Sequence, residues 1–393
     1  MKKKLLGPAI SIISFAVFLV ILEILLRLLA PVPDPYEMIK AEGNQYIPSS
    51  FPTNFRMGTQ VEEGLPGMQG SHSFTTNNLG FRGDHLSLPK PANEFRVFLL
   101  GGSAMESIYL DDSQVISSIL QKELNKHVSQ PAVVKVYNGA KSGAFTLDHV
   151  ALIAHRIIHL QPDMIIVCEG INDLSRSIYN FDYLLYDIGR NSQKKLPFFR
   201  LLKILATEFQ IPRRIYYFLR RISSADELKT LQEISNKSNY RSKVELRKSA
   251  PLTNKKPRTD LISFRNNLTS MVGICQAHNI RLVLMTQASS WNSSIDPEIK
   301  NWQWMLYRNG VTYRADLMEE ALESLNNVTR QEAAEHSVPL YDLARSVPKS
   351  SDFFYDDAHF NVKGAEWVGK NLASFLVENT LIPVSGINTG PNK

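Results

Sequence analysis

The sequence contains only two cysteines in 393 residues, and this scarcity removes several classes of site. Cys168 and Cys275 both lie inside apolar segments, so we expect two buried thiols rather than a disulfide. No cysteine pair and no cysteine–histidine spacing matches a metal-binding pattern. The cysteines therefore predict no metal site, and they give no indication of the compartment of the protein.

Motifs for nucleotides and nucleic acids are also missing. There is no G-x-G-x-x-G, and no Lys-Ser or Lys-Thr follows the glycines at 101–102, which argues against a phosphate-binding loop. The formal net charge is +6, but residues 191–260 hold 17 Lys or Arg against 6 Asp or Glu, a net of +11. Because no recognised binding motif accompanies this charge, we predict no nucleic-acid partner.

One long apolar run is present, at residues 5–30, after the lysines at 2–4. It is long enough to cross a bilayer and longer than the core of a cleavable signal peptide. The preceding lysines predict a single-pass membrane protein with a cytoplasmic N-terminus and its body in the periplasm or outside the cell. A signal anchor is thus expected, with a cleaved signal as the alternative. Glu23 and Arg27 are four residues apart and can pair on a helix.

The domain organisation is predicted from a change in the hydrophobic pattern at residue 94. Residues 31–93 lack sustained periodicity and predict a juxtamembrane region, in which 77–85 looks like an ordered loop of no assigned role. From 94 to 377, apolar runs of strand length alternate with helical patterns, which predicts a mostly parallel sheet covered on both faces. Residues 378–393 form a tail. The expected strands are 95–100, 132–137, 163–168, 280–286 and 338–341, and the expected helices are 113–126, 146–160, 260–278, 310–336 and 361–377.

A basic insertion at about 176–259 interrupts this alternation. Residues 196–221 mix bulky apolar side chains with arginines, a composition that suits an anionic membrane surface or a hydrophobic lid. The alternative is a pair of helices packed on the domain with a solvated basic face. Residues 235–260 are polar and basic, and we expect them to be mobile.

The residues that could carry chemistry follow the predicted strands, where ligands bind in a doubly wound sheet. Taken singly, Ser103, Asn172 and His359 are ordinary cap or surface residues, and Gly143 is an ordinary turn glycine. Together they supply a nucleophile, a base and donors for a tetrahedral intermediate. Asp356 lies three residues before His359, so its carboxylate can reach Nδ1–H and leave Nε2 facing Ser103. The rival Asp357 has a spacing that points it away.

These segments resemble the blocks of the SGNH (GDSL-like) hydrolase family. The blocks are "GGS" at 101–103, "NGAKSG" at 138–143, "GIND" at 170–173 and "DDAH" at 356–359. The resemblance covers about 94–175 and 260–377, and it implies an α/β, three-layer, flavodoxin-like, doubly wound parallel sheet. One difference is that Gly102 stands where the family often has Asp. The absence of a G-x-S-x-G elbow around Ser103 weakens the α/β-hydrolase alternative.

The resemblance also implies roles for the residues. Ser103 would attack an ester carbonyl, His359 would move the proton, and Asp356 would orient the imidazole. The oxyanion hole would consist of the N–H groups of Ser103 and Gly143 and the side-chain amide of Asn172.

The function expected from this resemblance is that of a membrane-anchored bacterial serine esterase that acts without a metal or a cofactor. Its substrate would be an acyl ester, with an O-acetyl group on a cell-envelope or extracellular glycan as the candidate. Alternatives are an O-acyltransferase or its accessory that modifies an exported polysaccharide, a lysophospholipase or thioesterase, and a scaffold that only binds glycan.

Overall fold

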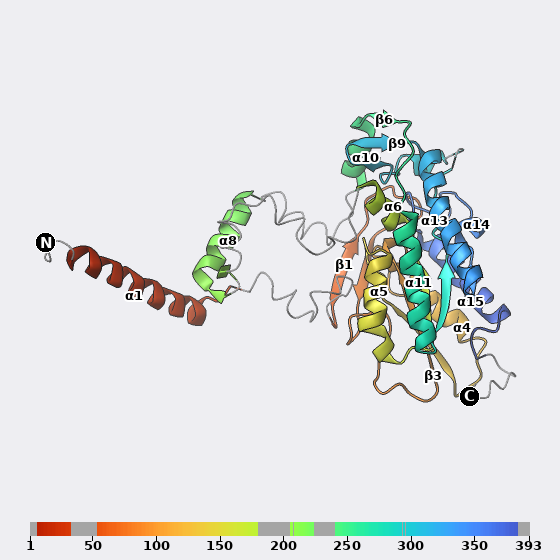
Figure 1. The fold of residues 1–393 in the computed structure, drawn as a ribbon, viewed down its shortest axis with the longest axis horizontal. Coiled ribbons are helices and arrows are strands. Elements are labelled where there is room, and N and C mark those ends of the chain that lie inside the picture. Colours follow the sequence, from red (N-terminus) through yellow and green to blue (C-terminus); the bar gives the residue numbers. More distant parts are fainter. Residues whose placement is uncertain are drawn as a thin grey trace. The chain divides into compact units, whose positions relative to one another are not determined.

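The computed structural model divides the chain into two compact units, each described here by itself (Figure 1). The first contains residues 1–45 and 184–233, and the second contains residues 46–183 and 234–393. The structure describes residues 6–32, 53–179, 205–206, 208–223, 240–292, 294 and 296–383.

The first unit pairs helix α1 (Leu6–Leu29) with helix α8 (Gln210–Ser223). Glu23 and Arg27 form the expected ion pair, with 2.8 Å between Oε1 and Nε. The same carboxylate accepts the first two backbone N–H groups of α8, at 2.8 and 2.9 Å. A carboxylate at a helix N-terminus compensates both the free donors and the helix dipole, so the pair on α1 caps α8. Part of the predicted apolar-basic segment is therefore helical, while 196–204 lies outside the described residues.

The predicted transmembrane anchor is not supported by the structure. Among the residues that the structure describes, no helix is both long enough and apolar enough to cross a membrane. The expected location of the N-terminus and of the rest of the chain is not tested by the structure, and it stays a prediction.

The second unit is built on a five-stranded sheet of the predicted parallel type. Its order is β10–β7–β5–β3–β4, and every neighbouring pair is parallel. If the strands are numbered 1 to 5 along the chain, their order across the sheet is 2-1-3-4-5. The chain adds strand 2 on one side of strand 1 and strands 3 to 5 on the other, so the order changes direction between strands 1 and 3, which are β3 and β5. The crevice for a ligand is therefore expected beyond the ends of β3 and β5. The strands are β3 (Glu94–Gly101), β4 (Val133–Asn138), β5 (Met164–Cys168), β7 (Arg281–Met285) and β10 (Leu340–Tyr341).

Helices cover both faces of this sheet and make the second unit three-layered. Val97 and Leu99 of β3 pack in one apolar cluster and Phe98 and Leu100 in the other, because successive strand residues point to opposite faces. Helices α4 (Ile116–Leu124) and α15 (Val362–Glu378) pack together on one face. On the other, α11 (Leu261–Ala277) packs against α5 (Thr146–His155) and α13 (Ala315–Glu335), as Figure 1 shows for α5 and α11. Both cysteines are buried and free, as predicted.

Residues 53–93 differ from the predicted juxtamembrane region. They belong to the second unit and contain the antiparallel pair β1 (Arg56–Gln60) and β2 (Ser71–Thr75). Phe74, Phe81 and Leu86 are each at most 2% exposed. Apolar side chains buried this completely contribute to the core of the unit, which the irregular sequence pattern did not indicate.

The second half of the basic insertion also belongs to this unit. It forms helix α10 (Tyr240–Ser249) and strand β6 (Leu252–Thr253), in a stretch predicted to be mobile. Strand β6 joins β9 (Val311–Tyr313), which pairs with β8 (Tyr307–Arg308) in a three-stranded sheet, and α10 packs on β9 (Figure 1). We call α10, this sheet and the connecting loop 302–306 the appended layer. Tyr240 and Val244 anchor α10 because both are buried.

Candidate active site

Three predicted residues meet at the carboxyl edge of the central sheet. Ser103 begins the short helix α3 (Ser103–Glu106), directly after β3. Its Oγ lies 2.7 Å from Nε2 of His359, and Nδ1 of that ring lies 2.8 Å from both carboxylate oxygens of Asp356. A histidine bonded in this way can accept the serine proton through Nε2 while the carboxylate fixes its orientation.

Asp356 is completely buried, and its remaining hydrogen bonds come from fixed donors. Its Oδ1 accepts the backbone N–H groups of Ala358 and His359 at 3.0 and 2.9 Å. Its Oδ2 accepts the indole N–H of Trp304 at 3.1 Å. Burial acts to raise the pKa of Asp356, but the neighbouring His359 and the backbone donors lower it below its usual value. The carboxylate is therefore held in the ionised form that stabilises an imidazolium.

The neighbouring carboxylate of Asp357 is engaged elsewhere. It accepts the indole N–H of Trp291 at 2.7 Å and the backbone N–H groups of Trp304 and Met305 at 2.6 and 2.8 Å. Burial and the charge of Asp356 raise the pKa of Asp357 to about 6. Asp357 thus fixes the loop that carries Trp304, and it forms no bond to His359 among the described contacts. Trp304 itself lies in a loop, and no motif in the sequence indicates its role.

The position of Asn172 depends on Gly102, the residue between β3 and α3. Its Nδ2 donates one hydrogen to the carbonyl of Ala144 at 2.7 Å. The second hydrogen on Nδ2 is not used in that bond and can be donated to another acceptor. A Cβ on Gly102 would lie 2.4 Å from this Nδ2. The glycine therefore leaves room for the amide beside Ser103, and any side chain at position 102 would displace it.

Gly143 lies in the loop after β4, with a φ of +79° that favours glycine. The preceding Ser142 donates its hydroxyl and its backbone N–H to the carboxylate of Glu106, at the end of α3. This contact ties the Gly143 loop to the helix of Ser103. Burial raises the pKa of Glu106 to about 7, although Ser142 and the charges of Lys141 and Arg82 act in the opposite direction. Glu106 gave no signal in the sequence.

Arg82, within the loop 77–85, binds the C-terminal end of α3. Its guanidinium donates to the carbonyls of Glu106 and Ser107 at 3.1 and 3.0 Å, and to the carbonyl of Leu110 at 2.5 Å. It also bonds the carboxylate of Asp112 at 2.6 Å. Carbonyls at a helix C-terminus lack partners within the helix, and a buried arginine can satisfy several of them. The loop 77–85, to which the sequence pattern assigned no role, thus supports the helix that begins at Ser103.

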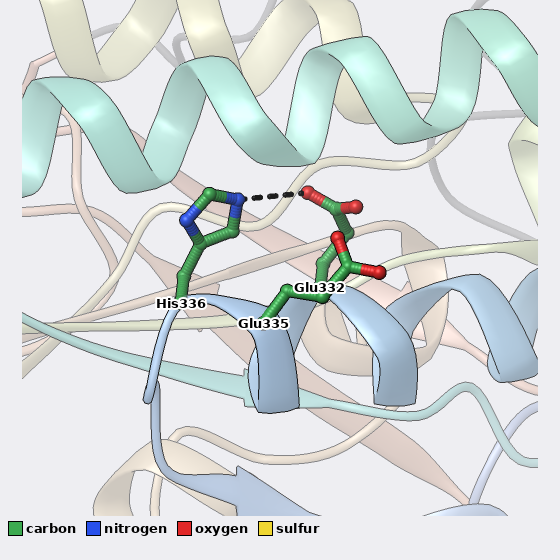
Figure 2. A group of neighbouring side chains, drawn as sticks. All are labelled: Glu332, Glu335 and His336. Atoms are coloured by element: carbon green, nitrogen blue, oxygen red, sulfur yellow. Dashed lines mark ion pairs between the residues drawn. The ribbon is translucent and has the colours of Figure 1, made fainter.

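One group of side chains outside this site has the residue types of a metal site. Glu332, Glu335 and His336 lie together at the end of α13, as Figure 2 shows. The carboxylate of Glu332 is already engaged, because Oε1 accepts from Arg265 at 2.5 Å and Oε2 from Thr269 at 2.6 Å. Its charge is compensated without an ion, so we assign it a structural role.

Comparison with protein families identifies the fold family. The model of the GDSL-like lipase/acylhydrolase family matches residues 99–367, which is more than half of the chain. The chain belongs to this family. Membership implies an enzyme that hydrolyses ester bonds, which agrees with the resemblance seen in the sequence. All four blocks, from Ser103 to His359, fall within the matched range.

Solved structures of related fold have low sequence identity to this chain. A lipase/acylhydrolase from Enterococcus faecalis is 14% identical with a TM-score of 0.39, over 72% of this chain and 96% of that one. An acetylxylan esterase from Geobacillus stearothermophilus is 14% identical with a TM-score of 0.40, over 75% and 97%. A comparison with curated proteins finds no match. Similarity at this level carries no argument about the substrate.

Proposed function

We propose that this protein is a serine esterase that forms an acyl-enzyme at Ser103. The observation that carries the proposal is the chain of contacts from Ser103 Oγ through His359 to Asp356, at 2.7 and 2.8 Å. A buried carboxylate, an imidazole and a hydroxyl in this order are the parts that nucleophilic acyl transfer needs.

The proposed reaction has two steps. Ser103 Oγ attacks the ester carbonyl while His359 Nε2 takes its proton, and the bond to the leaving alcohol then breaks as His359 returns that proton to it. Water, deprotonated by His359, attacks the acyl-enzyme and releases the acid and Ser103. The negative oxygen of each tetrahedral intermediate would be held by the N–H groups of Ser103 and Gly143 and by the amide of Asn172.

Exposure of the site favours access of an external ester. Gly143 is exposed, and Ser103 and Asn172 are half-buried. A short acyl group such as acetyl, on a glycan, is the substrate class predicted from the sequence, and a series of acyl chain lengths would test it.

The proposal is tested by labelling the full chain with a fluorophosphonate and by measuring hydrolysis of p-nitrophenyl acetate. We expect the fluorophosphonate to label Ser103 in the unmodified protein. Both the labelling and the hydrolysis should be lost in Ser103→Ala. Ser270→Ala is the matched control, because that hydroxyl is exposed and, among the described residues, bonds only the carbonyl of Asn266 in its own helix. An undiminished rate in pure Ser103→Ala would remove Ser103 from the mechanism.

If an alcohol acceptor added to the same assay diverted the acyl group faster than water, the acyltransferase alternative would replace hydrolysis.

A further inference from the structure

Two cations from the appended layer lie beside the catalytic residues. Lys243 of α10 places Nζ 4.0 Å from the centre of the Trp304 ring, and Arg308 of β8 places Cζ 5.5 Å from it. Trp304 is the residue whose indole N–H binds Asp356. Both positive groups are thus separated from the proposed catalytic carboxylate by a single side chain.

Arg308 also reaches the other side of the site. Its Nε and one Nη donate to the hydroxyl of Ser175, both at 3.3 Å. Ser175 is three residues after Asn172 on α6 (Ile171–Ile178), so the two side chains share one face of that helix. The guanidinium therefore extends from the helix of the proposed oxyanion donor to the ring beside Asp356.

Neither cation has a carboxylate partner among the described residues, in contrast to two other buried arginines of the same unit. Arg82 and Arg96 each pair with an acid at 2.6 Å. Arg308 is only 6% exposed, and its other bond is to the carbonyl of Tyr307 at 2.8 Å. One hydrogen on each Nη then has no acceptor in the described part of the chain. A positive charge buried without a counter-ion costs free energy, which an arriving anion would recover.

The carboxylates nearest to these cations are already engaged. Asp356 binds His359, and Asp357 accepts three N–H groups of Trp291, Trp304 and Met305. Burial lowers the pKa of Lys243 and of Arg308, and the charge of Asp357 opposes the change in both. Attack on a neutral ester requires neither cation. They are therefore available to bind a group of the substrate that does not react.

We propose that Arg308 and Lys243 form an anion subsite for a carboxylate or phosphate group carried by the ester substrate. The inference rests on the proposed esterase function and specifies its substrate class. A guanidinium presents a planar pair of donors that suits either oxyanion, and an ammonium adds a point charge. Because Ser175 is half-buried, as Asn172 and Ser103 are, this subsite adjoins the accessible part of the site.

Matched esters test the proposal with the full chain. Acetate release is measured from O-acetylated methyl glucoside, O-acetylated methyl glucuronate and O-acetylated methyl glucoside 6-phosphate. Release of p-nitrophenol is compared between p-nitrophenyl valerate and mono-p-nitrophenyl glutarate, whose acyl groups both have five carbons. The first set places the anion on the alcohol and the second on the acyl group. We expect kcat/KM for at least one anionic ester to exceed that of its neutral partner by about tenfold to a hundredfold, as charge-assisted hydrogen bonds allow.

Variants then assign the preference to these residues. Lys243→Met and Arg308→Met should each reduce the anionic-to-neutral ratio by about tenfold, while Arg308→Lys should retain part of it. Lys248→Met is the matched control, since that lysine is exposed on the same helix and pairs with Glu245. Equal losses for neutral and anionic esters would show a merely structural role and overturn the inference.

If Arg308→Met does not fold, the proposal can still be tested on the unmodified protein by measuring how anions affect the labelling of Ser103. Glucuronate and glucose 6-phosphate should slow fluorophosphonate labelling of Ser103 in the unmodified protein, and glucose should not. Equal kcat/KM for all esters, with Ser103 still labelled, would overturn the anion subsite and leave the esterase proposal standing. Absence of both labelling and hydrolysis would overturn the two together.

Discussion

The central sheet and the appended layer contribute different parts of the same site. Ser103, Gly143 and Asn172 follow β3, β4 and β5, whose carboxyl ends meet at one edge because the strands are parallel. The appended layer supplies Trp304, Lys243 and Arg308, none of which is part of the serine, histidine and carboxylate set. The sheet edge therefore holds the groups proposed to react, and the appended layer holds groups proposed to choose the substrate. Substitutions at the carboxyl edge of the sheet should lower kcat most. Substitutions in the appended layer should change the preference between anionic and neutral esters.

The largest effect is expected at Asp356. In Asp356→Asn the amide cannot hold the imidazole in the correct tautomer, and kcat for p-nitrophenyl acetate should fall by about 10³–10⁴. Asp352→Asn is the control, because that exposed carboxylate pairs only with Lys363 among the described residues. A decrease of less than tenfold for Asp356→Asn would mean that the carboxylate does not act through His359.

The next largest effect is the pH dependence that Glu106 gives to the stability of the folded protein. Its pKa of about 7 in the folded protein exceeds the ordinary 4.5, so the folded state holds a proton that the unfolded state has lost between these values. Stability from this group is highest below pH 4.5 and falls as pH rises to 7, by about 3 kcal/mol in total. Glu106→Gln removes the dependence.

The measurement for this prediction is urea unfolding at pH 5 and pH 8, followed by tryptophan fluorescence. All four tryptophans lie in the second unit, so the signal reports on it. The unmodified protein should lose about 2–3 kcal/mol more than Glu106→Gln between the two pH values. Parallel loss in both proteins would contradict the raised pKa.

A smaller effect is expected at Gly102. The methyl group of Gly102→Ala would lie at 2.4 Å from Asn172 Nδ2, and the end of that side chain can move away without unfolding. We expect kcat to fall by about tenfold to a hundredfold, less than the 10²–10³ typical for complete loss of an oxyanion donor.

The control for Gly102→Ala is Gly273→Ala in α11, because no atom lies within 4 Å of the added Cβ there. In a double-mutant cycle, Gly102→Ala should add little to Asn172→Ala, since both act through the same amide. Additive losses would show that Gly102 has another role.

The smallest effect is expected in the appended layer, at Trp304. Trp304→Phe keeps an aromatic ring for Lys243 and removes one hydrogen bond to Asp356, at a cost of about 1 kcal/mol, or several-fold in kcat. The preference for anionic esters should persist. Trp367→Phe is the control, because that ring packs on Phe353 and makes no hydrogen bond to Asp356 or His359 among the described contacts. If Trp304→Phe lowered kcat as much as Asp356→Asn, the proposal that the sheet edge reacts and the appended layer selects the substrate would be wrong.

Sequence patterns predicted the central sheet closely and the rest of the second unit poorly. The five expected strands and the five expected helices are present, because buried parallel strands and amphipathic helices leave strong local periodicity. Most ends shift by a few residues, but the helix expected at 310–336 begins at Ala315, and residues 311–313 form strand β9 instead. The hairpin β1–β2 and the appended sheet were missed. Strands of two or three residues such as β6 and β9 are too short to show a period. The predicted transmembrane helix rested on hydropathy alone, and the structure does not support it.

The sequence by itself determined the set of residues proposed to react, because the first three blocks follow strands with their own turn chemistry and Asp356 and His359 are local neighbours before the last helix. Only the tertiary structure decided which groups surround that set. Arg82 and Glu106 hold α3 and the Gly143 loop through contacts with residues far along the chain, and Arg308 meets Ser175 across 133 positions. Contacts of this kind depend on where the chain folds back, and no local pattern encodes them.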